Sequence, residues 1–269
     1  MSGLRTYAAG AARVLRRSRL RGFLGPHEER LVFVVGCPRS GTTFTGSALG
    51  SLPGFVDMDE VTPLKAALPE LATLPEVDAA RELRRIVERV RLLGLARRLR
   101  GVEQTPETSF VVRAALRAYP QATAVHVVRD GRDVVCSLLE RGWFRAAHEG
   151  ADDAGHAYGA QPRFWVEAAR REEFPRVSEA RRAAWAWRRY VTAARDGATV
   201  EVRYESLRDS AAVLAEALGA DEARVEGALG GFRGESVGRW REDLTPEQLA
   251  DVEEEAGDLL AELGYTLSG

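Results

Sequence analysis

Short apolar runs, each bounded by glycine, proline or charged residues, predict the strands of this chain. The clearest runs lie at residues 31–36, 123–128 and 199–204, and a weaker one lies at 54–57. Continuous apolar runs of this length are typical of strands that are buried on both faces of a sheet. We therefore expect a parallel sheet, in which the intervening segments supply the crossover connections.

Helical periodicity fills most of the intervals between these runs. It predicts helices at residues 78–100, 113–119, 133–141, 178–195, 210–218 and 246–263. The last helix follows Thr245, whose N-cap position, with a proline next and Gln248 three residues on, predicts a capping box. Strands that alternate with helices predict an α/β fold, in which a central parallel β-sheet is flanked by helices on both faces.

Two stretches lie outside this alternation. Residues 1–30 are basic and predict a helical segment that is solvated or frayed, with peripheral contact to a membrane or a partner as the alternative. Residues 145–165 lack periodicity and contain several glycines, which predicts a mobile surface loop. Long loops without regular structure are uncommon in compact domains unless they serve a purpose, so we interpret this one as a substrate lid.

Composition narrows the classes of function. The chain has 269 residues and a net charge of -2, which argues against a nucleic-acid binder. No apolar run is long enough to span a membrane, and the N-terminus lacks the apolar core of a secretory signal, so we expect a cytoplasmic protein. Cys37 and Cys136 fit a reducing compartment, and four scattered histidines give no metal-ligand spacing, so we expect no metal. The single lysine among 38 basic residues suggests a GC-rich, bacterial genome.

A first anion site is predicted between Gly36 and Thr43, where the sequence GCPRSGTT joins a strand to a helix. In such a loop, successive backbone N–H groups converge on one point, and the positive end of the helix dipole adds to them. Arg39 contributes a charge. A nucleoside triphosphate loop would carry lysine where this chain has Thr42. The site therefore favours a group with less charge than a γ-phosphate and its magnesium ion, and a phosphosulfate fits.

A second anion site is predicted where the strand at 123–128 ends in Arg129. A turn follows, and Ser137 lies eight residues further along, one turn into the next helix. An arginine fork and a hydroxyl can bind one tetrahedral dianion from two directions. A salt-bridged turn is the alternative interpretation.

Together the two sites resemble those of the cytosolic and carbohydrate sulfotransferases, which use 3′-phosphoadenosine 5′-phosphosulfate (PAPS). The resemblance covers residues 31–265 and implies a Rossmann-like P-loop fold. Residues 1–30 would then form a basic N-terminal segment, and residues 31–269 a sulfotransferase domain with its lid at 145–165. The acceptor would be a small molecule, a lipid or a carbohydrate, and the alternative function is that of a P-loop kinase or NTPase.

The resemblance also implies roles for individual residues. The loop for the 5′-phosphosulfate would comprise Cys37, Pro38, Arg39, Ser40, Gly41, Thr42 and Thr43, and the 3′-phosphate site would comprise Arg129 and Ser137. Residues 202–207 are similar to the family's Tyr-Glu-Asp-Leu segment, whose tyrosine lies near the adenine, and this matches Tyr204. Residues 231–240 resemble the C-terminal segment that helps to hold the 3′-phosphate. Arg233 and Gly234 match that segment, although its lysine is absent.

Sulfuryl transfer to an alcohol, phenol or amine needs in-line positioning, neutralised charge on the departing phosphate, and a base. Arg39 and the threonines of the loop are the expected charge stabilisers. Glu60 resembles the glutamate base of several bacterial members and is the first candidate for that role. Glu103 is the second, in a segment similar to the family's Glu-Lys-Thr-Pro, where this chain has Gln104 in place of lysine. The sequence does not predict the oligomeric state.

Overall fold

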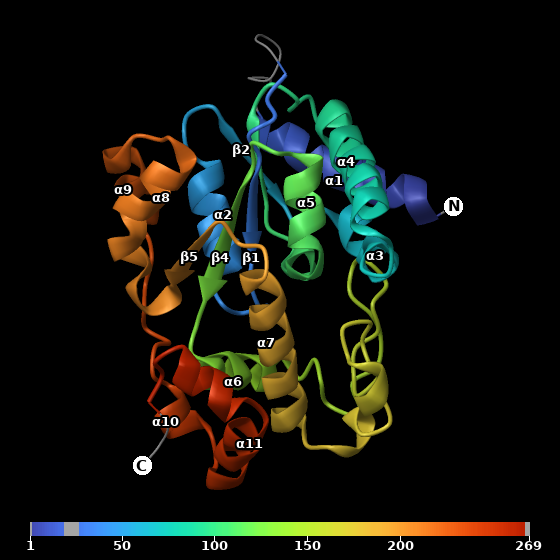
Figure 1. Cartoon of the computed structure of the whole chain (residues 1–269), viewed down its shortest axis with the longest axis vertical. Coiled ribbons are helices and arrows are strands. Elements are labelled where there is room, and N and C mark those ends of the chain that lie inside the picture. The colour runs from blue at the N-terminus through green and yellow to red at the C-terminus, as the bar shows by residue number, and fades with distance from the viewer. Residues whose placement is uncertain (1, 19–26, 267–269) are drawn as a thin grey trace.

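The computed structural model describes residues 2–18 and 27–266. Its centre is a sheet of parallel strands (Figure 1), namely β1 (Val32–Val35), β2 (Phe55–Asp59), β3 (Arg100–Glu103), β4 (Thr123–Val128) and β5 (Val200–Arg203). The strand order is β2-β3-β1-β4-β5. The chain leaves β1 toward the β2 edge and later returns past β1 to β4, so the order reverses beside β1. Ligands of open parallel sheets bind beyond the carboxyl ends of the strands at such a reversal.

Helices cover both faces of the sheet. They are α1 (Ser2–Ser18), α2 (Thr42–Gly50), α3 (Thr62–Leu71), α4 (Glu76–Leu93), α5 (Val112–Ala118), α6 (Gly131–Arg141), α7 (Glu179–Arg195), α8 (Ala211–Leu218), α9 (Glu222–Leu229), α10 (Trp240–Asp243) and α11 (Pro246–Glu262). Short 3₁₀ helices are η2 (Pro106–Val111), η3 (Ala168–Arg170), η4 (Phe174–Arg176) and η5 (Tyr204–Ser210). This is the α/β arrangement that the sequence predicted.

Alternate residues of β1 point to opposite faces and enter different cores. Val32 and Val34 pack with α2, α8 and α9, whereas Phe33 and Val35 pack with α1, α3, α4 and α5. A third apolar cluster, formed by α6, α7 and α11, lies beyond the carboxyl ends of the strands (Figure 1). There Trp187 donates a hydrogen bond from its Nε1 to the carbonyl oxygen of Arg129 at 3.0 Å. The third cluster thus supports the turn that follows β4.

The prediction of a helix at 78–100 is wrong at its C-terminal end. Helix α4 ends at Leu93, and Arg100–Glu103 forms the inner strand β3. The strand was missed because charged residues stand at both of its ends. Both are buried, but both are satisfied: Arg100 donates to the carbonyl of Leu218, and Glu103 accepts from Thr105 and Thr108. Buried polar groups that find such partners are tolerated in a sheet. The pattern also predicted none of the helices α3, α9 and α10.

The N-terminal helix α1 is packed rather than solvated over its described part. Ala11 and Val14 are buried, and α1 lies against α3, α4 and β2. Arg17 forms ion pairs of 3.2 Å with both Asp57 and Asp59 at the end of β2. Residues 1 and 19–26 of the predicted segment lie outside the described residues. No described helix has the length and apolar character needed to cross a membrane.

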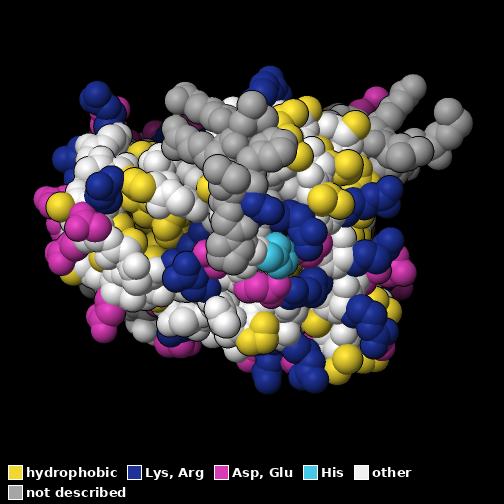
Figure 2. Space-filling model, turned by 90° about the horizontal axis from the view of Figure 1, so that it is seen from above, with side chains coloured by type: hydrophobic (Ala, Val, Ile, Leu, Met, Phe, Trp, Pro, Cys, Tyr) yellow, Lys and Arg dark blue, Asp and Glu magenta, His cyan; other side chains and the backbone are white. Residues whose placement is uncertain are grey.

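Figure 2 shows the molecule from the side opposite the carboxyl ends of the strands. Basic and acidic side chains are interspersed over the described part of this face. A continuous basic surface would be expected of a nucleic-acid binder, and the described part of this face does not form one.

Candidate active site

The loop of residues 36–43 joins β1 to α2 and lies where the strand order reverses. Two glycines allow neighbouring segments to approach it closely. Gly36 has φ 147°, and a Cβ there would lie 2.6 Å from the carbonyl oxygen of Val127. Gly41 has φ 95°, and a Cβ there would lie 2.5 Å from the ring of Tyr204. Larger residues would be strained and would clash at both positions, so the loop can contact both β4 and η5.

A cavity of about 420 Å³ adjoins this loop and contains most of the predicted nucleotide-binding residues. Those that line it are Arg39, Gly41, Thr42, Thr43, Arg129, Ser137, Tyr204 and Arg233. We call it the cationic cavity, because four arginines line it and Glu140 is its one carboxylate among the described residues. Arg239, which the sequence did not single out, donates a 3.0 Å hydrogen bond to Glu140. Positive charge therefore dominates.

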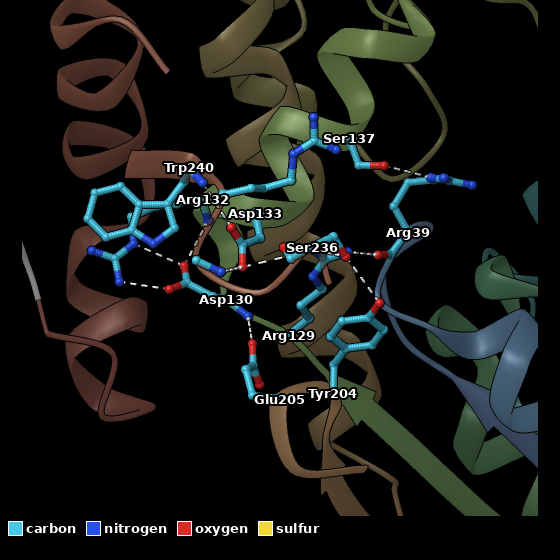
Figure 3. A network of polar contacts seen from close by, with 12 residues as sticks. Arg39, Arg129, Asp130, Arg132, Asp133, Ser137, Tyr204, Glu205, Ser236 and Trp240 are labelled. Atoms are coloured by element: carbon cyan, nitrogen blue, oxygen red, sulfur yellow. Dashed lines mark hydrogen bonds and ion pairs between the residues drawn. The ribbon is translucent and has the colours of Figure 1, made fainter. Parts of the chain in front are cut away.

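Arg39 lies in this cavity in the left-handed conformation, with φ 74°. Its Nε donates a 2.9 Å hydrogen bond to the hydroxyl of Ser137 (Figure 3). Burial lowers the pKa of Arg39, and the nearby charges of Arg141 and Arg129 lower it further. A bound anion would relieve this repulsion.

Arg129 ties three segments together. Its Nη1 donates to the carbonyl of Arg39 at 3.0 Å, and its Nη2 donates to the carbonyl and hydroxyl of Ser236 at 2.7 and 3.0 Å. The ring of Tyr204 covers the guanidinium at 4.3 Å, and Asp133 lies 3.9 Å away on the other side (Figure 3). Its Nε is buried and has no hydrogen-bond partner among the described residues. Arg129 therefore joins β4, the loop after β1 and the C-terminal segment of residues 231–239.

The structure brings Arg129 and Ser137 to the same cavity but pairs Ser137 with Arg39. The other predicted residues lie nearby. Cys37 and Pro38 line a second cavity, and Gly234 lies next to Arg233. Ser40 is buried, and its hydroxyl has no hydrogen-bond partner within the described ranges. The side chain of Arg233 is 81% exposed, which places it at the mouth of the cationic cavity. The sequence analysis did not single out Ser236, although this residue lies two positions after Gly234 in the predicted segment of residues 231–240.

The second cavity has a volume of about 90 Å³ and shares Cys37 and Pro38 of the same loop. We call it the acidic cavity, because three carboxylates and two cations line it: Glu60, Glu107, Asp152, Lys65 and Arg163. The predicted lid supplies Asp152, Tyr158, Arg163 and Trp165. Burial raises the pKa of the Cys37 thiol, with the charge of Glu107 adding to the effect. Cys37 therefore stays protonated and forms part of the wall.

Glu60, the first candidate base, lines the acidic cavity just after β2. Its Oε2 accepts a 2.6 Å hydrogen bond from Lys65 Nζ. Burial raises the pKa of Glu60, although the charge of Lys65 opposes this. Burial alone would lower the pKa of Lys65, but Glu107, Glu60 and Asp152 outweigh it and raise that pKa. Lys65 thus stays charged, and it lies 3.4 Å from Asp152 and 3.6 Å from Asp153 of the predicted lid.

Replacing Lys65 with methionine is expected to loosen this part of the lid. The Lys65 side chain is 10% exposed, so its ion pairs are screened less than surface pairs. We expect amides of residues 151–158 to exchange about fivefold to tenfold faster, which corresponds to roughly 1 kcal/mol. Hydrogen–deuterium exchange can follow the bonds from Asp152 N to His156 O and from Tyr158 N to Gly150 O. Arg145→Met, which removes a 66% exposed lid cation, is the control and should change little. Equal amide exchange at residues 151–158 in K65M and in the wild type would contradict the conclusion that Lys65 holds this part of the lid.

Glu103, the second candidate base, lines neither cavity. It is fully buried, and its two carboxylate oxygens accept from Thr105 N at 2.7 Å and from Thr108 Oγ1 at 3.0 Å. It therefore anchors the turn between β3 and η2. Gln104 donates from its Nε2 to Asp59 at 3.1 Å. Among residues 2–18 and 27–266, no three His, Cys, Asp or Glu side chains are grouped to hold a metal ion.

No protein-family model matches the sequence, and no curated protein is significantly similar to it. Several solved structures match it, and two of them are similar enough to show its fold. The sulfotransferase domain from the curacin biosynthetic pathway has 12% sequence identity and a TM-score of 0.58, with 90% of this chain and 100% of that domain covered. The sulfotransferase domain from the Synechococcus PCC 7002 olefin synthase has 16% identity and a TM-score of 0.56, with 91% and 98% covered. The chain therefore has the fold of these sulfotransferase domains.

Proposed function

We propose that this protein transfers the sulfuryl group of PAPS to a hydroxyl or amine of a small-molecule, lipid or carbohydrate acceptor. The observation that carries the proposal is that one loop, residues 36–43, borders two cavities of opposite character. The cationic cavity suits an anionic donor, and the acidic cavity suits a group that gives up a proton. A loop shared between them suits a reaction that passes a group from one to the other.

The cationic cavity offers binding groups for a nucleotide with two separate anionic ends. Thr42, Thr43 and the N-terminus of α2 offer donors for the phosphosulfate. Arg129 and Ser137 offer donors for the 3′-phosphate. The unpartnered Nε of Arg129 is a buried donor that a bound phosphate could satisfy.

Aromatic side chains of the same cavity offer a wall for the adenine. The rings of Tyr204 and Phe232 lie 4.9 Å apart, and those of Phe44 and Phe232 lie 5.4 Å apart. Base–aromatic stacking tolerates any base, because every base has a π-face. These rings support nucleotide binding without specifying the base.

In this proposal the protein's own residues act on the two ends of the transferring bond. Arg39 and the loop hydroxyls neutralise charge on the departing phosphate oxygen. Glu60 lines the cavity where the acceptor would lie, and burial raises its pKa, which makes the carboxylate a better proton acceptor. A carboxylate base that accepts the acceptor's proton completes the transfer.

The residues of the cationic cavity fit the alternative function, that of a P-loop kinase or NTPase, less well. Thr42 stands in the place of the lysine that would contact the β- and γ-phosphates. Glu140, the carboxylate that lines the cationic cavity, already pairs with Arg239. The cavity thus offers little to a magnesium–triphosphate complex, which needs a free acidic ligand.

A thermal-shift comparison tests the proposal. Adenosine 3′,5′-bisphosphate at 100 times its Kd is expected to raise Tm by about 5 °C or more, because binding to the folded state alone adds about 2.7 kcal/mol. Adenosine 5′-monophosphate, which lacks the 3′-phosphate, should stabilise the protein less. Stabilisation by ATP with magnesium, with none by the bisphosphate, would favour the kinase alternative.

A further inference from the structure

The acidic cavity contains a buried carboxylate, Glu107, to which the proposed function assigns no role. Glu107 lies in η2, directly after Pro106, and only 6% of the surface of this residue is exposed. Its Oε1 accepts a 3.1 Å hydrogen bond from the hydroxyl of Tyr190. Its Oε2 is buried and has no hydrogen-bond partner among the described residues. A buried carboxylate oxygen is normally hydrogen-bonded, so this one lacks a partner that a bound molecule could supply.

The two carboxylates of the cavity differ in what already engages them. Glu60 accepts from Lys65 at 2.6 Å, and Lys65 also pairs with Asp152 of the lid. Glu107 accepts no hydrogen bond from a cation within the part of the chain that the structure describes, although its charge, like that of Glu60, raises the pKa of Lys65. Glu107 is also held in place by Tyr190, whereas its second oxygen is unoccupied. A proton acceptor needs such a free oxygen within reach of the substrate.

The remaining walls indicate what kind of molecule fits beside Glu107. Arg163 of the lid lines the cavity, and its Nε is buried without a hydrogen-bond partner among the described residues. The rings of Trp143, Tyr158 and Trp165 also line it. The cavity thus offers an oxygen that accepts a hydrogen, a nitrogen that donates one, and an aromatic surface for an apolar body.

The charge of the acidic cavity further limits which acceptors it can bind. Three carboxylates and two cations line the cavity, which leaves a net negative charge. An anionic acceptor would have to enter against this charge, whereas a neutral or cationic one would not. A cationic acceptor would gain in addition from the faces of the aromatic rings.

We infer that Glu107, in place of Glu60, is the catalytic base, and that the acceptor is a neutral or cationic alcohol or phenol with an apolar body. This inference rests on the proposed function. In the transfer step, the acceptor oxygen forms a bond to sulfur while the bond from sulfur to the bridging oxygen breaks. The electron pair of that bond goes to the departing phosphate, and the acceptor proton goes to Oε2 of Glu107 and then to water. Glu60 acts as a positioning residue that holds Lys65 and, through it, the lid.

The test compares Glu107→Gln with the wild type by calorimetry, using three phenols of similar shape as acceptor probes. They are 4-ethylphenol (neutral), tyramine (cationic) and 4-hydroxyphenylacetate (anionic), each titrated into the complex with adenosine 3′,5′-bisphosphate. The wild type is expected to bind the first two about tenfold or more tightly than the third. Glu107→Gln should lose the preference for tyramine over 4-hydroxyphenylacetate, while its affinity for the bisphosphate should stay within about twofold of the wild-type value. Failure of the neutral and cationic probes to bind, or tighter binding of the anionic probe, would overturn the acceptor class.

The catalytic role is tested separately by slow release of the bisphosphate from PAPS, with water as the acceptor. Glu107→Gln should lower this rate by about a hundredfold, and Glu60→Gln by much less. Tyr190→Phe keeps the carboxylate but frees its Oε1, and it should lower the rate by roughly threefold to tenfold. The role of Glu107 as the base would be overturned if Glu107→Gln left the rate unchanged. It would also be overturned if Glu60→Gln lowered the rate more than Glu107→Gln did. If the wild type does not bind the bisphosphate, the proposed function fails instead.

Discussion

Replacing Arg129 with alanine is expected to weaken binding of adenosine 3′,5′-bisphosphate by about thirtyfold or more, over about 2 kcal/mol. Two effects add. The variant loses a charged donor that lines the cationic cavity, and it also loses the bonds that join Arg39 to Ser236 through this guanidinium. Calorimetric titration of the bisphosphate into the folded variant measures the change.

Two further variants make this result interpretable. Arg129→Lys keeps the charge but loses the fork that reaches both neighbours, so it should recover only part of the affinity. Arg113→Ala removes the same charge from α5, where the side chain is 65% exposed, and should leave the affinity unchanged. If Arg129→Ala binds the bisphosphate as tightly as Arg113→Ala does, the 3′-phosphate site is misplaced.

Replacing Glu103 with glutamine is expected to change how stability depends on pH. Burial raises the pKa of Glu103 from 4.5 to about 7, although hydrogen bonds from Thr105 and Thr108 oppose this. Between these pH values the folded protein keeps a proton that the unfolded chain releases. The contribution of Glu103 to stability is therefore present in acid and is lost as pH rises from 4.5 to 7, by roughly 3 kcal/mol in all.

Glutamine cannot titrate, and it fills the same space. Denaturant unfolding of the wild type and of Glu103→Gln at pH 5 and pH 8 should therefore show the variant gaining about 2–3 kcal/mol relative to the wild type at the higher pH. Glu149→Gln, at an exposed position of the lid, is the matched control and should run parallel to the wild type. Parallel curves for Glu103→Gln as well would show that Glu103 is not held in its protonated form by burial.

Much of the fold could be predicted because the sheet is buried on both faces. The apolar runs at 31–36 and 123–128 correspond to β1 and β4, which are buried along their whole length and so need apolar residues at nearly every position. The run at 199–204 corresponds to the edge strand β5, in which Val200 and Val202 alternate with Glu201 and Arg203. Strand β3 could not be found in this way. Its charged ends are satisfied by partners far away in sequence, such as Leu218, and only the folded structure brings those partners together.

The residues of the candidate site also fall into those that the sequence could predict and those that it could not. The loop of residues 36–43 could be found from sequence, because its chemistry resides in one continuous segment whose glycines have a conformational reason. Glu107 and Lys65 could not, because each owes its environment to other segments: Tyr190 on α7 for the first, and Asp152 in the lid for the second. The only available signals were that Lys65 is the single lysine and that Glu107 follows the segment around Glu103.

The most direct test of the account is a crystal structure of the protein with adenosine 3′,5′-bisphosphate. We predict that the 5′-phosphate lies against the backbone of residues 36–43, and that the 3′-phosphate lies within hydrogen-bond distance of Arg129 or Ser137. The adenine should lie among Tyr204, Phe44 and Phe232. A nucleotide bound outside this cavity, or one whose 3′-phosphate contacts neither Arg129 nor Ser137, would contradict the account.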